Sequence, residues 1–148
     1  MSHVRELMVE AIKTAVTGLP TVGSTNVFRD RVSPLQRTEL PALVVRFPPA
    51  TEDVAVDQFP APRITDRLCR IQVAGVVATK DGFGSLLNQI GLEVEQALAM
   101  PIAGPWKHLT IRRVDFDLTG TAEQPTGEIA MTYEARYYVA ENAPETAL

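Results

Sequence analysis

The sequence predicts an α+β fold in which two helices cover one face of a mixed, largely antiparallel sheet of about five strands. Two observations carry this prediction. Apolar residues recur at steps of three and four in two separate segments, which is the spacing of amphipathic helices. The segments between and after them alternate apolar and polar residues, which is the period of a β-strand. Two helices can cover only one face of such a sheet, so the expected architecture is a two-layer sandwich.

Length and composition are those of one globular domain. The chain has 148 residues, of which 45% are hydrophobic and 22% charged. We expect residues 1–140 to form the domain and residues 141–148 to be a frayed C-terminal tail. The net charge of -4 argues against non-specific DNA binding, and a single cysteine excludes an internal disulfide or a multi-cysteine zinc site. Without a signal segment or a long apolar run, we expect a cytoplasmic site of synthesis and no membrane span.

Each predicted helix has one apolar stripe. The first helix is expected to end at Gly18 and Pro20. Its stripe consists of Val4, Leu7, Met8, Ala11, Ile12, Ala15, Val16 and Leu19. The second helix stops before Pro101, and its stripe consists of Phe83, Leu86, Leu87, Ile90, Val94, Ala97 and Leu98. Only Arg5 and Lys13 lie opposite the first stripe, which is too little positive charge for a membrane-surface helix. Both stripes are therefore expected to pack on the sheet.

Residues 27–47 are predicted to form a β-hairpin. The first half alternates apolar and charged residues, with Arg29 and Arg31 on one side, and the second half is an almost continuous apolar run. The expected hairpin thus has one half-exposed strand and one buried strand. A strand with two arginines on one side is typical of a sheet edge or of a surface that faces a partner.

Residues 48–63 have no period of either kind. They contain four prolines and three acids among small residues, so we expect a long surface loop or arm. A loop of this length in a small domain is more often functional than not. The alternatives are therefore a solvated loop and an arm that reaches a binding partner.

Three further strands are predicted, at residues 64–79, 109–119 and 127–139. The last two have the cleanest period-2 patterns in the chain and should pair as a second hairpin. In the final strand, one side is apolar or aromatic and the other carries threonine, glutamate, arginine and tyrosine. That polar side is expected either to be solvated or to meet a partner.

No residues form a recognisable catalytic motif. His3 and His108 stand far apart without a second ligand at metal spacing, and Cys69 lies on an apolar strand face, as expected of a core residue. Asp115 and Asp117 share a strand face and could do acid–base chemistry or bind a cation. Cross-strand arginines would satisfy them equally well. The structural interpretation is favoured, and a small metal- or ligand-binding domain or enzyme that uses these two aspartates remains the alternative.

Charged surfaces are then the best candidates for function. Three arginines and three arm acids form the candidate interface: Arg29, Arg31, Arg46, Glu52, Asp53 and Asp57. The arginines would cluster if the first hairpin pairs as predicted. A basic patch and an acidic arm on one domain could pair head to tail between copies and close into a ring. The alternative is that each is merely a solvated face.

The order of elements and four short segments resemble a known family. The first predicted helix ends in TGLPTVG (residues 17–23), which is followed by NVFRDRVSPL (26–35) and LPALVV (40–45), and the closing hairpin contains IAMTYE (129–134). This pattern resembles the tail terminator proteins (minor tail protein U-like) of long-tailed bacteriophages and prophages. The likeness is one of pattern and size over nearly the whole chain, and no binding residue can be transferred from it.

The resemblance implies a non-enzymatic, structural role and a small α/β sandwich fold. Such proteins form a hexameric ring on the completed tail tube, stop its polymerisation and offer a surface to head-completion proteins. The implied partners are other copies of the chain, the tail tube protein and a head-completion or connector protein. No cofactor, membrane or sequence-specific nucleic acid is expected. The implied location is the head-proximal end of the virion tail, after assembly in the host cytoplasm. A neck or head–tail completion protein is the alternative within this class.

Overall fold

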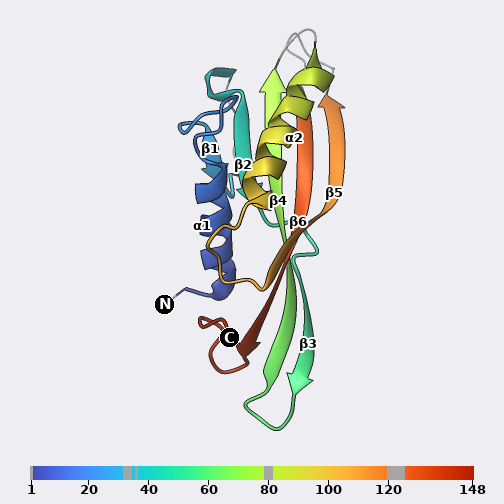
Figure 1. The fold of residues 1–148 in the computed structure, drawn as a ribbon. Coiled ribbons are helices and arrows are strands. Elements are labelled where there is room, and N and C mark those ends of the chain that lie inside the picture. The colour runs from blue at the N-terminus through green and yellow to red at the C-terminus, as the bar shows by residue number, and fades with distance from the viewer. Residues whose placement is uncertain (1, 32–34, 36, 79–81, 120–125) are drawn as a thin grey trace.

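The computed structural model describes residues 2–31, 35, 37–78, 82–119 and 126–148. The elements follow in the order α1 (Val4–Val16), β1 (Val27–Arg29), a short 3-10 helix (Arg37–Glu39), β2 (Ala42–Arg46), β3 (Glu52–Gln58), β4 (Ile64–Ala78), α2 (Phe83–Ala99), β5 (His108–Thr119) and β6 (Thr126–Ala140). Figure 1 shows both helices on one side of a long, twisted sheet. The predicted α+β sandwich is confirmed, although the sheet has six strands and not about five.

The sheet is built around β4. Its strand order is β1-β2-β4-β6-β5, and β3 also pairs with β4. All pairs are antiparallel except β1 with β2. β2 runs along one half of β4, from Ala42 opposite Val76 to Arg46 opposite Gln72, and β3 runs along the other half of the same edge. The two strands therefore act as one interrupted strand, and the break falls at two adjacent prolines, which cannot donate ladder hydrogen bonds.

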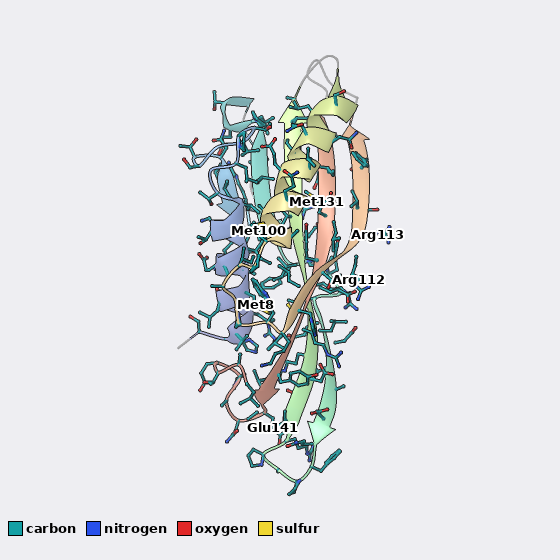
Figure 2. The ribbon with its side chains drawn as sticks, viewed as in Figure 1. Met8, Met100, Arg112, Arg113, Met131 and Glu141 are labelled. Atoms are coloured by element: carbon teal, nitrogen blue, oxygen red, sulfur yellow. The ribbon has the colours of Figure 1, made fainter. Side chains whose placement is uncertain are left out.

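The core lies between the helices and the odd-numbered residues of β4 and β6. Val73 lies opposite Met131, and Ile71 lies opposite Tyr133. These side chains are buried, and Met8 of α1 joins Met131 in the layer between helix and sheet (Figure 2). This is the side that the alternation in the sequence predicted to be apolar. Burial of one apolar face from each element is what holds the two layers together.

Residues 27–47 do not form the predicted hairpin. β1 runs parallel to β2, with Val27 opposite Leu43 and Arg29 opposite Val45. Asp30 ends β1 with a positive φ of 49°, and its N–H donates to the carbonyl of Val45. β2 therefore runs in the same direction as β1, and the chain re-enters the sheet from the end at which β1 began. A tight turn would have given an antiparallel pair.

Residues 48–63 are not an irregular loop either. Its central part, Glu52–Gln58, is β3, which pairs antiparallel with β4 from Glu52 opposite Cys69 to Gln58 opposite Ile64. Together they make a projecting hairpin (residues 52–68), which extends beyond both helices in Figure 1. Most of β3 is exposed on both sides, so apart from Val54 and Val56 its sequence carries no apolar alternation that would mark a strand. The prolines lie outside the strand, before and after it.

The C-terminal segment is not frayed. The N–H of Glu141 donates to the carbonyl of Arg63, and the N–H of Leu148 donates to the carbonyl of Tyr138. The carbonyl of Pro144 accepts from the N–H of Val4, one of the donors that a helix N-terminus leaves without an intrahelical partner. Ala147 packs against the core. The tail is therefore part of the domain, because it satisfies backbone groups at the start of α1.

Candidate interaction surfaces

The predicted cluster of Arg29, Arg31 and Arg46 does not form. Arg29 lies on the helix side of the sheet, and it makes ion pairs with Glu6 (2.5 Å) and Glu10 (2.6 Å) of α1. Hydrogen bonding to Glu6 and Glu10 raises the pKa of Arg29 further above its ordinary value. The three groups therefore join β1 to α1. The hypothesis failed because it assumed an antiparallel register between the two strands.

The other two arginines are also engaged within the chain. Arg31 pairs with Glu39, and its guanidinium lies 4.7 Å from the centroid of the Phe28 ring. Arg46 projects from the sheet face away from the helices, where it pairs with Glu128 at 2.6 Å. Arg29 and Arg46 thus stand on opposite faces of the sheet, and no single partner surface contacts both.

The carboxylate of Glu52 is bound by three side chains of the described residues. Its side chain is only 8% exposed, and its carboxylate accepts hydrogen bonds from Arg5, from Arg67 (3.4 Å) and from the hydroxyl of Tyr137. Burial, and then the hydrogen bond to Glu52, raise the pKa of the Tyr137 hydroxyl, which therefore remains a donor. This cluster joins α1, β4 and β6 at the base of the projecting hairpin. Glu52 is thus an anchor of the fold, and the prediction of a free interface acid is wrong for this residue.

The other two arm acids lie apart from Glu52. Asp53 projects to the opposite sheet face and accepts a hydrogen bond from Arg70 at 2.7 Å. Asp57 is exposed near the tip of the hairpin. The arm acids therefore do not form one acidic surface, because alternation along β3 places neighbouring side chains on opposite faces.

Cys69, His3 and Asp115, which were considered for chemistry, each have a structural role or partner within the chain. Cys69 is fully buried, and burial raises the pKa of its thiol to about 12, so it is a core residue as predicted. His3 caps α1, with Nδ1 accepting from the N–H of Arg5 at 3.1 Å. Asp115 accepts from Arg113 at 2.8 Å, and Figure 2 shows Arg113 on the outer side of β5. Among the residues that the structure describes, no group of three or more His, Cys, Asp or Glu could hold a metal ion.

Charged side chains on the sheet face away from the helices form ion pairs between neighbouring strands. Asp66 of β4 lies opposite Tyr138, and Arg136 of β6 lies opposite Leu68. The two charged side chains are thus diagonal neighbours across the strand pair, and they form an ion pair at 2.5 Å. Glu134 lies 3.9 Å from Arg70 and 3.5 Å from Arg112. Cross-strand pairs of this kind stabilise a sheet modestly and keep its face polar. The charged side chains named here therefore neutralise one another within one chain.

Sequence reasoning did not identify the exposed apolar side chains. Val54, Val56 and Phe59 on the projecting hairpin form what we call the hairpin patch, and they are 55%, 43% and 73% exposed. Leu92 of α2, with Val114 and Phe116 of β5, lines what we call the β5 groove. Val114 and Phe116 alternate with charged residues along β5, but the alternation cannot show that the helices leave them exposed. No helix in the described part of the chain is long and apolar enough to cross a membrane.

The fold is shared with a known assembly component. A chain in the solved structure of the virion of a native gene transfer agent particle is similar to this one, with a TM-score of 0.56 and 16% sequence identity. The similarity covers 90% of this chain and 97% of that chain, so it concerns the complete two-layer arrangement. At this identity it shows a common fold. No protein-family model matches the sequence, and the search among curated proteins finds no match.

Proposed function

We propose that this protein is a non-enzymatic structural component of a virion that forms a ring, with six copies, on the end of the tail tube. The ring would end tail polymerisation and provide the surface to which the head is joined. The observation that carries the proposal is the fold similarity, over nearly the whole of both chains, to a chain of a gene transfer agent virion. The likeness of residues 17–45 and 129–134 to tail terminators supports the narrower role.

The surfaces of the chain suit a protein that works by contacting other proteins. The side away from the helices is polar, and its charges are paired within the chain. Two exposed apolar patches lie elsewhere, on the projecting hairpin and beside β5. Exposed apolar patches of this kind mark protein–protein contacts more often than chance. The proposed partners are further copies of the chain, the tail tube protein and a head-completion or connector protein, at the head-proximal end of the tail.

Electron microscopy of particles made without this protein tests the role. A terminator predicts overlong tails, because nothing stops the addition of tube subunits. Tails of normal length that fail to join heads would instead indicate a neck protein and would overturn the terminator assignment. Normal, fully joined particles would remove both.

Ring formation is tested separately by size-exclusion chromatography with light scattering, with and without purified tail tubes. We expect assembly into a ring at high concentration or on the tube end. The tube must be included because a terminator can stay monomeric until it meets its template. A strict monomer that never associates with tubes would contradict the proposal.

A further inference from the structure

The hairpin patch is apolar and largely exposed in the part of the chain that the structure describes. Val54 and Val56 lie opposite Arg67 and Thr65 of β4, on the sheet side that carries the helices. The helices end before this part of the sheet, as Figure 1 shows. Phe59, at the turn that follows β3, is 73% exposed. Surface strands usually carry polar side chains, so three large apolar residues in one exposed strand and turn indicate a contact.

The β5 groove is a second uncovered apolar site. α2 packs on β4 and β6, and Leu109 and Ile111 of β5 also pack against the core. Farther along β5, Val114 and Phe116 are 41% and 53% exposed, and Leu92 of α2 beside them is 47% exposed. These side chains line a groove of about 260 Å³ that has Ile129 and Gly91 at its base. A Cβ at Gly91 would lie 3.0 Å from Cδ1 of Ile129, so the glycine lets α2 approach the sheet closely here.

Arg63 beside the hairpin patch and Glu95 beside the β5 groove carry opposite charges, although the hairpin also carries the exposed Asp57. α2 contains no lysine or arginine, and Glu95 lies on the rim of the groove. Arg63 stands at the hairpin end, with its guanidinium 5.7 Å from the centroid of the Phe59 ring. Within the described ranges of the chain, neither Arg63 nor Glu95 takes part in an ion pair. Such complementarity guides the approach of two surfaces and sets their orientation.

We propose that the hairpin patch of one copy docks into the β5 groove of the next copy, with Phe59 against Phe116 and Arg63 toward Glu95. The inference rests on the proposed ring and names the contact that would build it. In Figure 1 β3 projects beyond the helices, whereas β5 lies at the level of α2, so the hairpin of one chain does not reach its own β5 groove. Because the sites differ from one another, the contact is head to tail, which yields a closed ring when the rotation between copies permits.

Mixed crosslinking tests the pairing directly. Phe59→Cys and Phe116→Cys are made in separate full-length chains and treated with a short bismaleimide, alone and mixed. The native Cys69 is fully buried, so it does not compete. We expect a crosslinked dimer in the mixture and at most a trace in either variant alone, because head-to-tail docking brings Phe59 to Phe116 and neither residue to its own copy. No excess of dimer in the mixture would overturn the proposal.

Assembly of charged variants on tail tubes gives a second readout. Phe59→Asp and Phe116→Asp each remove one half of the contact, and we expect each to raise the concentration for half-assembly at least about 10-fold. Met100→Asp is the control, since Met100 is 65% exposed at the end of α2 and lines neither apolar site. It should assemble like the wild type. Circular dichroism confirms that each variant is folded.

The outcomes separate this inference from the proposed function. If the wild type forms rings on tubes and both aspartate variants assemble equally well, the ring stands and the docking of hairpin into groove is wrong. If the mixed crosslink forms but particles without the protein have normal, joined tails, the docking stands as a contact between copies and the terminator role is wrong.

Discussion

The helix-covered body of the sheet and the projecting hairpin both carry apolar residues on the helix side of the sheet, but only those in the body are buried. In the body, Ile71 and Val73 on this side are fully buried. In the hairpin, Val54 and Val56 lie on the same side and are about half exposed. Alternation along a strand therefore determines which residues share a face, but the length and position of the helices determine which of them are covered. Apolar residues beyond that cover do not stabilise the isolated fold, and their purpose must be sought in contacts with other chains.

The two regions are also held together by different forces. The body relies on apolar burial between the helices and the sheet. The base of the hairpin relies on Glu52, which binds Arg5, Arg67 and the hydroxyl of Tyr137 where the apolar layer ends. A buried carboxylate is costly unless it is paired, and here it has three donors. The hairpin is therefore attached to the domain by a polar joint.

The strongest test of this contrast compares truncations on the same sheet face. Ile71→Ala should lower the free energy of unfolding by ~2–5 kcal/mol, because it leaves a cavity in a fully buried site. Val56→Ala on the hairpin should change it by less than about 1 kcal/mol, the span of strand propensity. Urea denaturation followed by circular dichroism measures both. Similar losses at the two sites would mean that the hairpin patch is buried in solution.

The local sequence pattern was sufficient for the body and insufficient for the edges. The two helical stripes and the alternation in β4 and β6 predicted the elements, the faces and the two-layer architecture, because burial on one face leaves a period in the sequence. β3 leaves no such period, since it is exposed on both sides. The parallel pairing of β1 with β2 has no local signal, because neighbouring residues do not determine which strands pair or in which direction.

The candidate site was harder to predict for a related reason. Glu52 was predicted to be an interface acid, and its observed partners Arg5 and Tyr137 lie 47 and 85 residues away in the sequence. Arg29 and Arg46 were expected together, and the observed register puts them on opposite faces. Which charges meet depends on strand pairing, and pairing over long distances cannot be read from neighbouring residues.

Substitutions at two adjacent acids test the polar joint. Glu52→Gln should lower the free energy of unfolding by about 2 kcal/mol, because hydrogen bonds to a buried carboxylate are lost. Asp53→Asn is the matched control. Its pair with Arg70 lies at the surface, where ion pairs contribute less than about 1 kcal/mol. Hydrogen exchange sharpens the test, since amides of β3 should exchange faster in Glu52→Gln while those of β2 are unchanged. Equal effects of the two variants would exclude Glu52 as the anchor.

A second paired carboxylate, in the body, predicts a pH dependence. Burial raises the pKa of Glu93, but hydrogen bonds from the N–H and hydroxyl of Thr21 and from Gln89 outweigh it, and the pKa lies below its ordinary value. A lowered pKa in the folded state stabilises the protein above the unfolded value of 4.5, and this contribution is lost as the pH falls through the folded value.

Urea unfolding at pH 7 and pH 3 measures this contribution. The wild type should lose about 1 kcal/mol more than Glu93→Gln between the two values, since the variant has no carboxylate to protonate. Lys13→Gln also changes the net charge by one unit, but at a residue outside the Glu93 cluster. It should keep the pH dependence of the wild type. Identical pH profiles for the wild type and Glu93→Gln would show that the Thr21 contacts contribute nothing.

The smallest expected effect belongs to the double substitution Asp115→Asn, Asp117→Asn. Asp115 is paired with the exposed Arg113. Asp117 lies opposite Glu128, so removal of the Asp117 charge relieves a like-charge repulsion. The free energy of unfolding should change by no more than about 0.5 kcal/mol, and assembly on tail tubes should be unaffected. Melting curves with and without added Mg²⁺ or Ca²⁺ complete the test. If a cation raised the melting temperature of the wild type and this rise vanished in the double variant, β5 would carry a metal site, and the ligand-binding alternative would have to be preferred for this edge of the sheet.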